Sequence, residues 1–337
     1  MISVVCPIYN EEKYIAKCID SILEQDFPHD DMEVLFVDGM SSDRTREIVL
    51  EYTEKYKFIR LLDNPHRTSP YAMNIGIENA VGDTIFRMDA HAQYPNNYLS
   101  ELYKKLQELP NAENVGGVCE TLPCNDTNEA YAIAEVLSNS FGMGNSYFRT
   151  GISEIRKVDT VPFGCFHKSL FKRIGLYDTD LDRNQDDELN GRIIRNGGSI
   201  YIIPAIKIKY FARDKMEKVR KMFYQYGLYK PLVNKKLGAP ATIRQFVPLL
   251  FLLALVFGGI LSLCSEVIRI LFFAMICLYL GIGLYIGIKK ASKHKRPLLA
   301  LLMPYAFFNT HISYGWGYLC GIFKILFKQP LNVKSNR

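Results

Sequence analysis

Short apolar runs alternate with helix-like segments along the first 90 residues of the chain. Four of these runs have the length of a buried strand: residues 2–6, 34–37, 58–62 and 84–88. Asn10 is the expected N-cap of the first helix, which follows the first run. That helix places apolar side chains at three- and four-residue spacing: Ile15, Cys18, Ile19 and Ile22. Four strands separated by helices predict an α/β fold with a mostly parallel sheet.

The pattern after residue 89 is less regular, but it still predicts helices and strands. Helices are expected at residues 97–109, 129–137 and 187–195. Strands are expected at residues 115–119, 200–203 and 206–211. We expect this second half to complete a mixed sheet and to line the second side of a ligand site.

Two stretches in the last third of the chain contain no charged residue, residues 246–265 and 270–288. Each is close to the ~20 residues that a helix needs to cross a bilayer, so two transmembrane helices are predicted. A later stretch, residues 297–323, is uncharged apart from His311, but Pro304 and several polar residues interrupt it. It is a third span, a re-entrant hairpin or an interfacial segment. The sequence thus predicts one domain over residues 1–235 and a membrane domain over residues 236–337.

The chain carries a formal net charge of +6, and its basic residues gather beside the two apolar stretches. This distribution fits an anionic membrane surface and does not favour nucleic acid as a partner. The positive-inside rule places residues 215–244 and 289–296 in the cytosol and the turn at residues 266–269 outside. The first residues lack the basic and apolar regions of a secretory signal. We therefore expect a multi-pass protein of the cell membrane whose N-terminal domain is cytoplasmic.

Whether the last apolar stretch crosses the membrane decides on which side of the membrane the C-terminus lies. A third full span would leave the basic residues that follow it, Lys324 and Lys328 among them, outside the cell. The charge pattern therefore favours a re-entrant or interfacial segment with a cytosolic C-terminus.

Polar residues stand directly after the predicted strands, where ligands bind in open parallel sheets. Asp38 ends the second strand and could accept hydrogen bonds from a nucleobase or ribose, although an Asp-Gly pair alone is more often a turn. Asp89 and His91 follow the fourth strand, and alternate residues of an extended chain point to the same side. They can therefore bind one divalent cation, Mn²⁺ or Mg²⁺, which would bridge a diphosphate. The alternative reading of an isolated DxH sequence is a solvated loop.

Three carboxylates stand at the start of the predicted helix 187–195: Asp186, Asp187 and Glu188. One explanation is a favourable interaction with the helix dipole. The other is that Asp186 accepts the proton of an attacking hydroxyl, which requires a carboxylate that faces the ligand site. Composition alone does not choose between them.

Four motifs follow one another along the chain: residues 4–11 (VVCPIYNE), 37–45 (VDGMSSDRT), 87–91 (RMDAH) and 185–189 (QDDEL). In this order they resemble the inverting family-2 glycosyltransferases of GT-A fold. The resemblance covers about residues 2–230 and is nearest to the succinoglycan-biosynthesis type of glucosyltransferase, in which the metal motif often reads Asp-Ala-His.

The resemblance implies a role for each motif. It makes Asp89 and His91 the ligands of the divalent cation and Asp186 the catalytic base. His91 replaces the usual second aspartate of the metal motif, and Gln185 replaces the usual glutamate before the base. Binding of the donor nucleotide is implied for four residues: Pro7, Tyr9, Glu11 and Asp38.

The resemblance also implies the reaction. A sugar would move from a nucleotide sugar, by family expectation a UDP-sugar, to a hydroxyl of a membrane-associated or lipid-linked acceptor in polysaccharide biosynthesis. The QxxRW signature of processive polymer synthases is absent from the sequence. We therefore expect one sugar to be transferred in each encounter.

Five further residues are candidates for the same site. Arg67 and Arg87 could pair with the diphosphate of the donor. At Phe163 and Gly164 a small residue would let the backbone approach a sugar. Asp187 is assigned with them to the acceptor or sugar side.

Other classes of protein fit the sequence less well. A nucleotidyltransferase would carry a glycine-rich phosphate loop after the first strand, and a dinucleotide oxidoreductase would carry GxGxxG, whereas residues 7–10 read PIYN. The eight cysteines form no CxxC pair, which argues against a zinc ribbon or a disulfide framework. The alternative that stays open is a non-catalytic membrane receptor or scaffold that binds a nucleotide sugar, in which Asp186 would be dispensable.

Overall fold

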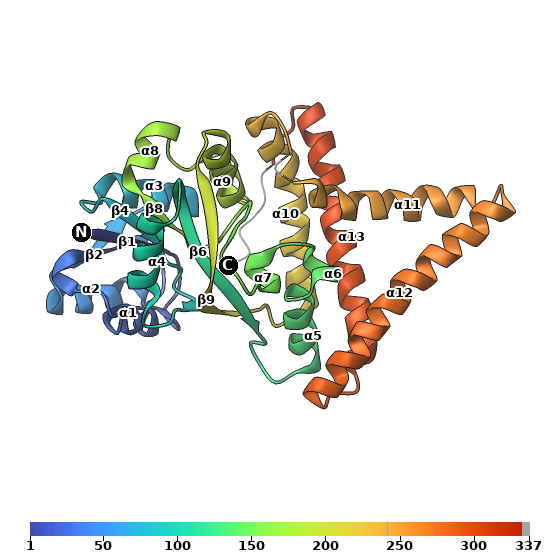
Figure 1. Cartoon of the computed structure of the whole chain (residues 1–337), viewed down its shortest axis with the longest axis horizontal. Helices are drawn as coiled ribbons and strands as arrows, with labels where there is room; N and C mark the ends of the chain where they lie inside the picture. Colours follow the sequence, from blue (N-terminus) through green and yellow to red (C-terminus); the bar gives the residue numbers. More distant parts are fainter. Residues whose placement is uncertain (241, 332–337) are drawn as a thin grey trace. The chain divides into compact units, whose positions relative to one another are not determined.

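The computed structural model describes residues 1–240 and 242–331, which form two compact units (Figure 1). Residues 1–120 and 151–210 form the sheet unit, and all the predicted site residues belong to it. Residues 121–150, 211–240 and 242–331 form the helical unit. These units divide the chain differently from the boundary expected near residue 235, because a helix before that boundary packs with the C-terminal helices.

Parallel strands make the first half of the sheet. The strand order β3-β2-β1-β4 puts β1 in the middle, paired with β2 on one side and β4 on the other. Every residue of β1 and β2 is buried, which explains why their apolar residues form continuous runs and do not alternate. The predicted α/β alternation is confirmed by these elements: β1 (Ile2–Ile8), α1 (Ile15–Leu23), β2 (Met32–Asp38), α2 (Thr45–Lys55), β3 (Ile59–Asp63), α3 (Ser69–Asn79) and β4 (Thr84–Arg87).

Antiparallel pairs make the second half, so the sheet is mixed. Strand β8 pairs antiparallel with β4 and β6, and β9 pairs antiparallel with β5 and β7. Within the described residues the sheet has nine strands. The added strands are β5 (Ala92–Gln93), β6 (Ala112–Leu122), β7 (Arg156–Lys157), β8 (Cys165–His167) and β9 (Ser199–Phe211).

Strand β9 corrects one expectation. The sequence predicted separate strands at residues 200–203 and 206–211, but a single strand runs through Pro204. A proline lacks only its own N–H donor, so it can interrupt a ladder at one position without ending the strand. The remaining helices of the sheet unit are η1 (His29–Asp31), α4 (Tyr98–Glu108), α8 (Lys168–Ile174) and α9 (Gln185–Arg195).

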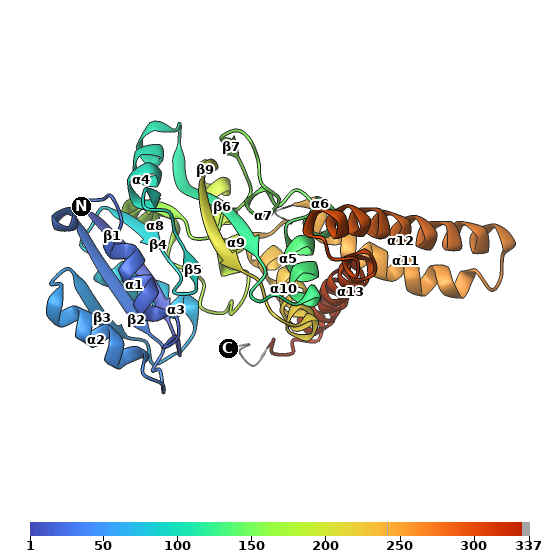
Figure 2. The same cartoon turned by 90° about the horizontal axis from the view of Figure 1, so that it is seen from below.

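The helical unit contains four long helices and several short ones. Helices α10 and α13 run alongside each other, and α11 and α12 extend together as a hairpin (Figures 1 and 2). Its core is apolar and joins α5, α10 and α13. The elements are α5 (Asn128–Leu137), α6 (Ser140–Met143), α7 (Tyr147–Thr150), α10 (Met216–Leu237), η2 (Ile243–Phe246), α11 (Val247–Leu261), α12 (Glu266–His294) and α13 (Leu299–Leu326).

Two helical segments in the described part of the chain are long and apolar enough to cross a membrane, Ile243–Leu261 and Glu266–His294. The predicted stretches 246–265 and 270–288 coincide with these helices. Only 17% of the first segment's apolar window and 6% of the second's are buried, as expected of a surface that lipid covers. The third apolar stretch is one continuous helix, α13, with no turn of the kind a hairpin would need.

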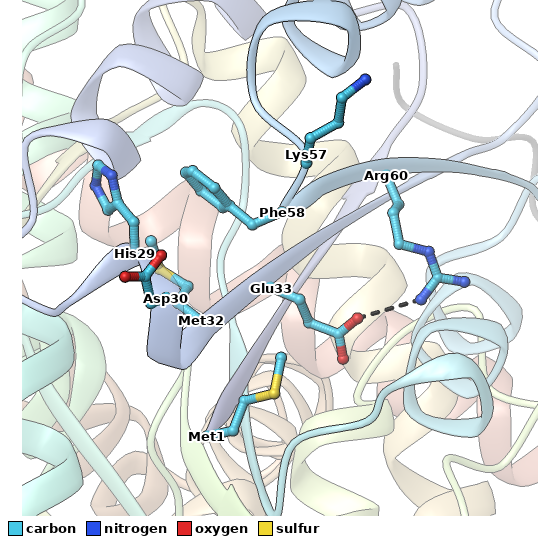
Figure 3. A pocket seen from close by; sticks show the side chains of 8 residues that line it. All are labelled: Met1, His29, Asp30, Met32, Glu33, Lys57, Phe58 and Arg60. Atoms are coloured by element: carbon cyan, nitrogen blue, oxygen red, sulfur yellow. Dashed lines mark hydrogen bonds and ion pairs between the residues drawn. The ribbon is translucent and has the colours of Figure 1, made fainter.

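A hollow of about 410 Å³ opens at the amino ends of the parallel strands (Figure 3). It is lined by Met1, which precedes β1, by Met32, which begins β2, and by Glu33. The Glu33 carboxylate already accepts hydrogen bonds from Ser3 Oγ at 2.6 Å, Val81 N at 2.5 Å and Arg60 Nη1 at 3.2 Å. This hollow lies at the strand ends opposite to those that carry the predicted site, and ligands of such sheets bind at the carboxyl ends.

Candidate active site

The strand order creates a topological switch point between β1 and β4. From β1 the chain moves outward through β2 to β3 and then returns to place β4 on the other side of β1. The carboxyl ends of β1 and β4 therefore lead into loops that diverge, which is where doubly wound sheets bind ligands. Glu11 follows β1, and Asp89 and His91 follow β4. The structure thus brings the predicted donor and metal residues to one place.

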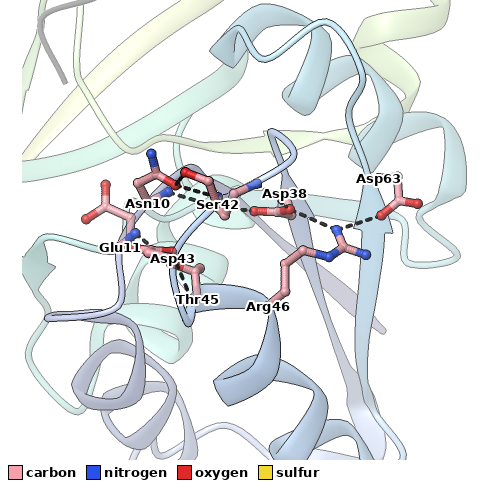
Figure 4. A network of polar contacts seen from close by, with 9 residues as sticks. Asn10, Glu11, Asp38, Ser42, Asp43, Thr45, Arg46 and Asp63 are labelled. Atoms are coloured by element: carbon pink, nitrogen blue, oxygen red, sulfur yellow. Dashed lines mark hydrogen bonds and ion pairs between the residues drawn. The ribbon is translucent and has the colours of Figure 1, made fainter.

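Asp38 is the centre of a polar network at the end of β2 (Figure 4). Its side chain has no exposed surface, and both carboxylate oxygens accept hydrogen bonds. Oδ1 accepts from Ser41 Oγ at 2.5 Å, and Oδ2 accepts from Ser41 N at 3.0 Å and from Arg46 at 2.8 Å. Arg46 also pairs with Asp63 at 2.8 Å. Asp38 therefore holds Arg46 and the turn after β2, and Arg46, which the sequence reasoning did not single out, connects the ends of β2 and β3.

The loops after β1 and β2 are joined by further hydrogen bonds. Glu11 N donates to Thr45 Oγ1 at 2.7 Å, and Asn10 Oδ1 accepts from Ser42 N at 2.9 Å. Asn10 is therefore not the N-cap of α1, which begins at Ile15. Its backbone is left-handed, with φ of 54°, and its side chain turns toward the neighbouring loop. The prediction was wrong because the partner of Asn10 lies 32 residues away in sequence.

Tyr9 and Arg67 meet at Gly39. A Cβ atom at Gly39 would lie 3.2 Å from Tyr9 Cδ2 and 3.4 Å from Arg67 Cα, so a side chain at this position would be tightly packed between these two residues. Arg67 is exposed, whereas Pro7 is buried within β1 and pairs in register with Val37. Pro7, one of the predicted nucleotide-binding residues, therefore lies inside the sheet and supports the loop after β1 from there.

Arg87 joins the end of β4 to the start of α9. The Arg87 side chain is nearly buried, its Nε donates to Asp89 Oδ1 at 3.3 Å and its Nη1 donates to Asp186. Burial opposes the charge of Arg87, but Asp186 and Asp89 together raise its pKa well above the ordinary value. Arg87 is therefore a fixed cation that connects the predicted metal ligand with the predicted base.

The surroundings of Asp186 control its charge. Burial raises the pKa of Asp186 above the ordinary value, the positive charge of Arg87 lowers it, and the negative charges of Asp89 and Asp187 raise it again. A carboxylate with a raised pKa is a stronger base than an exposed aspartate, which suits proton acceptance from a hydroxyl. The neighbouring Glu188 is buried and paired with Arg192 at 2.7 Å, so its role is structural.

Asp89 and His91 form a donor set of one carboxylate and one imidazole. Asp89 is nearly buried, and its backbone N–H donates to Tyr94 Oη at 2.7 Å. His91 Nδ1 lies 3.5 Å from Glu11 Oε1, which joins the loops after β4 and β1. Oxygen with imidazole fits Mn²⁺ or Mg²⁺, with phosphate oxygens as further ligands. Within residues 1–240 and 242–331, no group of three or more His, Cys, Asp and Glu side chains could hold a metal ion.

Phe163 and Gly164 directly precede β8, the strand that pairs with β4. Gly164 O accepts a hydrogen bond from Arg87 N at 3.0 Å. A Cβ atom at Gly164 would lie 2.0 Å from Asn114 Oδ1, so the small residue here is required by packing. Phe163 is buried in a left-handed conformation with φ of 50°, and its carbonyl accepts from Tyr98 Oη.

Left-handed backbone marks the borders of this site. Such a conformation is unfavourable for residues other than glycine, and it concentrates at functional loops. A local sequence pattern does not reveal it, because Met, Arg and Phe rarely adopt it. Three residues with positive φ stand in or beside the motifs, Asn10, Met40 and Asn184, and the candidate residues Arg67 and Phe163 also have positive φ.

Comparison with known proteins places the chain in a family. The family model of glycosyl transferase family 2 matches residues 3–178 of this chain. The dolichyl N-acetyl-alpha-D-glucosaminyl phosphate 3-beta-D-2,3-diacetamido-2,3-dideoxy-beta-D-glucuronosyltransferase of Methanococcus voltae is 30% identical over 330 residues, which are 96% of this chain and 97% of that protein. Succinoglycan biosynthesis protein ExoA of Rhizobium meliloti strain 1021 is 26% identical over 94% of this chain and 93% of that protein.

Solved structures share the fold. Mannosyltransferase PcManGT from Pyrobaculum calidifontis, determined with GDP-Man and Mn²⁺, has a TM-score of 0.59 and 21% identity over 97% of this chain and 87% of that one. S. aureus TarS in complex with UDP-GlcNAc has a TM-score of 0.52 and 18% identity over 97% of this chain and 92% of that one. These similarities agree with the mixed α/β sheet and its switch point. The chain belongs to glycosyl transferase family 2 and is a glycosyltransferase of GT-A fold.

Proposed function

We propose that this glycosyltransferase moves a sugar from a UDP-sugar to a hydroxyl of a membrane-associated, lipid-linked acceptor, with inversion and with one sugar transferred in each encounter. The observation that carries the proposal is the contact of Arg87 with both Asp89 and Asp186. A catalytic base must stand within reach of the hydroxyl that attacks the donor, and this contact supports the proposal because it holds Asp186 near Asp89, the proposed metal ligand.

The proposed reaction is a single displacement. The acceptor oxygen attacks the anomeric carbon while the bond from that carbon to the diphosphate oxygen breaks. The proton of the acceptor hydroxyl passes to Asp186, and the nucleoside diphosphate leaves with the bonding electrons. Because the attacking and leaving oxygens stand on opposite faces, the product has the inverted anomeric configuration. Asp187, on the same first turn of α9, would face the acceptor, and Phe163 and Gly164 would border the sugar.

The donor side is proposed to involve the loops after β1, β2 and β4. Tyr9, Glu11, Asp38 and Arg67 would orient the nucleotide, and Arg87 would hold the two carboxylates in place. Asp89 and His91 would bind a divalent cation, Mn²⁺ or Mg²⁺. When bound, this cation would neutralise negative charge on the diphosphate.

The acceptor is inferred from the relatives and from the helical unit. The Methanococcus voltae relative is named for transfer to a dolichyl-linked sugar phosphate, and the Rhizobium meliloti relative for succinoglycan biosynthesis. Both align with almost the whole of this chain, including the segments that are apolar enough to cross a membrane. A lipid-linked acceptor in polysaccharide or glycolipid synthesis at the cell membrane, with the sheet unit in the cytoplasm, fits these features.

The test compares Asp186→Asn with Asp187→Asn in purified protein supplied with labelled UDP-sugars and a lipid extract. Asp186→Asn should reduce transfer by a factor of about 10²–10⁴, as loss of a general base does, and Asp187→Asn should have a milder effect. In calorimetric titration with UDP and Mn²⁺, Asp186→Asn should bind normally and Asp89→Ala weakly. Near-normal turnover by Asp186→Asn would exclude it as the base. Product NMR that shows the donor's anomeric configuration would exclude inversion.

The same measurements address a non-catalytic receptor or scaffold. Such a protein would bind UDP in calorimetry without transferring sugar from any donor of the panel, and Asp186→Asn would change neither result.

A further inference from the structure

Helix α13 exposes a continuous apolar stripe along one side. At 100° per residue the side chains of the stripe fall within an arc of about 80°. Leu301 is 69% exposed at one end, Trp316 is 53% exposed past the middle, and Leu326 is 68% exposed at the other end. We call these residues the α13 stripe: Leu301, Tyr305, Phe308, Trp316, Phe323 and Leu326.

The opposite side of α13 is covered by protein. Its buried residues Met303 and Phe307 belong to the core shared with α5 and α10. Farther along, a Cβ atom at Gly317 would lie 2.1 Å from Tyr224 O, and a Cβ atom at Gly227 would lie 2.1 Å from Tyr314 O. The backbones of α10 and α13 are therefore in close contact, and the stripe is the side that no part of the helical unit's core covers.

The partner helix α10 is too polar to enter a bilayer core. Seven of its 22 residues are charged. A lysine or arginine at the centre of a span costs about 2.5–3.5 kcal/mol. If α13 crossed the bilayer, α10 would have to enter with it.

The connections of the chain also keep α13 on one side of a membrane. Helix α5, which packs on the first half of α13, lies in the segment 121–150 that leaves the sheet unit and returns to it. Its 10 residues span about 15 Å, half the ~30 Å of a hydrocarbon core. Helix α10, which packs along α13 as far as Gly321, begins five residues after β9 ends at Phe211. Both halves of α13 thus contact segments tied to the sheet unit.

The membrane hairpin starts beside the stripe. A Cβ atom at Gly315 would lie 2.4 Å from Pro248 O in the first turn of α11. Exposed lysines stand just outside both ends of the helix, Lys295 before it and Lys328 after it. An apolar side rich in aromatic rings, bordered by cations and continuous with a membrane hairpin, fits the boundary between anionic headgroups and acyl chains.

We propose that α13 lies in the plane of the membrane, with the α13 stripe in the headgroup and acyl-chain boundary of the leaflet that faces the sheet unit. The C-terminal end of α13 then stays on the same side as the sheet unit, and the helical unit has two spans. This inference rests on the membrane association in the proposed function.

The test uses Trp316, the only tryptophan in the sequence. The full chain is reconstituted into vesicles of phosphatidylcholine and phosphatidylglycerol whose acyl chains carry bromine near the ester end or near the methyl end. Bromine quenches tryptophan fluorescence on contact, so the stronger quencher reports the depth. Trp316 should be quenched more strongly by bromine near the ester end.

A second protein provides the deep reference. Leu278 is exposed in the middle of α12, and Leu278→Trp in a Trp316→Phe background should be quenched more strongly by bromine near the methyl end. Stronger methyl-end quenching of Trp316 would make α13 a span and overturn the inference. No quenching of Trp316 beside deep quenching of the reference would mean that water or a second copy of the chain covers the stripe, and would also overturn it. Absence of quenching in both proteins would contradict the proposed membrane association itself.

Discussion

The sheet unit and the helical unit differ in the side chains that they hold in unfavourable surroundings, which are buried charges in the first and exposed apolar groups in the second. The sheet unit buries charge at its strand ends, as at Asp38, Arg87 and Asp89. The helical unit exposes large apolar side chains, as at Leu263 and Trp316. A buried charge is unfavourable unless it is paired, and an extended apolar surface is unfavourable in water unless something covers it. Each unit therefore contains a feature that folding alone does not explain.

The two features indicate different functions. Buried, paired charges have fixed positions, and the pKa of Arg87 is raised by its two carboxylate partners, which a chemical step can use. An exposed apolar surface has no fixed partner, and a bilayer can cover it. The comparison suggests that the units fail in different ways when they are altered, and three substitutions can test this.

The largest effect is expected at Arg87. Arg87→Met would leave Asp89 and Asp186 without their common cation and should lower the free energy of unfolding by about 3 kcal/mol, the low end for a broken buried pair because Asp186 is partly exposed. Arg87→Lys should lose less, since it keeps the charge. Urea unfolding followed by circular dichroism measures both.

Arg173 is the matched control, because it pairs with Glu113 on the surface of the same unit. Arg173→Met should change the free energy of unfolding by less than about 1 kcal/mol. Equal losses for Arg87→Met and Arg173→Met would show that burial does not distinguish the two ion pairs.

An intermediate effect is expected where α10 meets α13. Gly317→Leu places side-chain atoms against Tyr224 O and should lower the stability of the helical unit by about 1–3 kcal/mol, as overpacking does. Gly281→Leu on α12 is the control, since a Cβ atom there would meet nothing within 4 Å. Thermal unfolding in detergent should separate the two variants. UDP affinity should stay the same in both, and a loss in Gly317→Leu would contradict independent units.

The smallest effect is expected at Glu135 on α5, which pairs with Lys290 and His294 at 2.5 Å. Burial raises the pKa of Glu135, whereas the hydrogen bonds to Lys290 and His294 lower it. The lowering is larger, so the pKa of Glu135 lies below the ordinary value. The carboxylate therefore stabilises the fold above its unfolded pKa of about 4.3, and this contribution is lost as the pH falls through the folded pKa. Glu135→Gln should remove this pH dependence and lower the free energy of unfolding at neutral pH by on the order of 1 kcal/mol.

Glu266 gives the comparison for this pH series, because its pair with Arg269 is exposed. Stability measured from neutral pH downward should fall in the same way for wild type and Glu266→Gln. A Glu135→Gln profile identical to the wild type would show that the pair does not contribute.

Several features of the fold could be predicted because they are local. Strands β1, β2 and β4 are buried along their whole length, so continuous apolar runs revealed them, and a helical spacing of apolar residues revealed α1. The two uncharged stretches revealed α11 and α12 by length alone. Helix α10 was not predicted, because its buried residues such as Val219 and Leu228 are mixed with lysines that its exposed side requires.

The sequence by itself predicted which residues stand at strand ends, Asp38, Asp89 and His91 among them. It did not determine that β4 lies beside β1, which brings His91 to Glu11, or that Arg87 pairs with Asp186, 99 residues away. The tertiary structure also decided that α13 is one continuous helix, and that α5 and α10 cover the side of it opposite the α13 stripe. The physical reason is that periodicity records whether a side chain is buried, whereas its partner depends on strand order and on packing between distant segments.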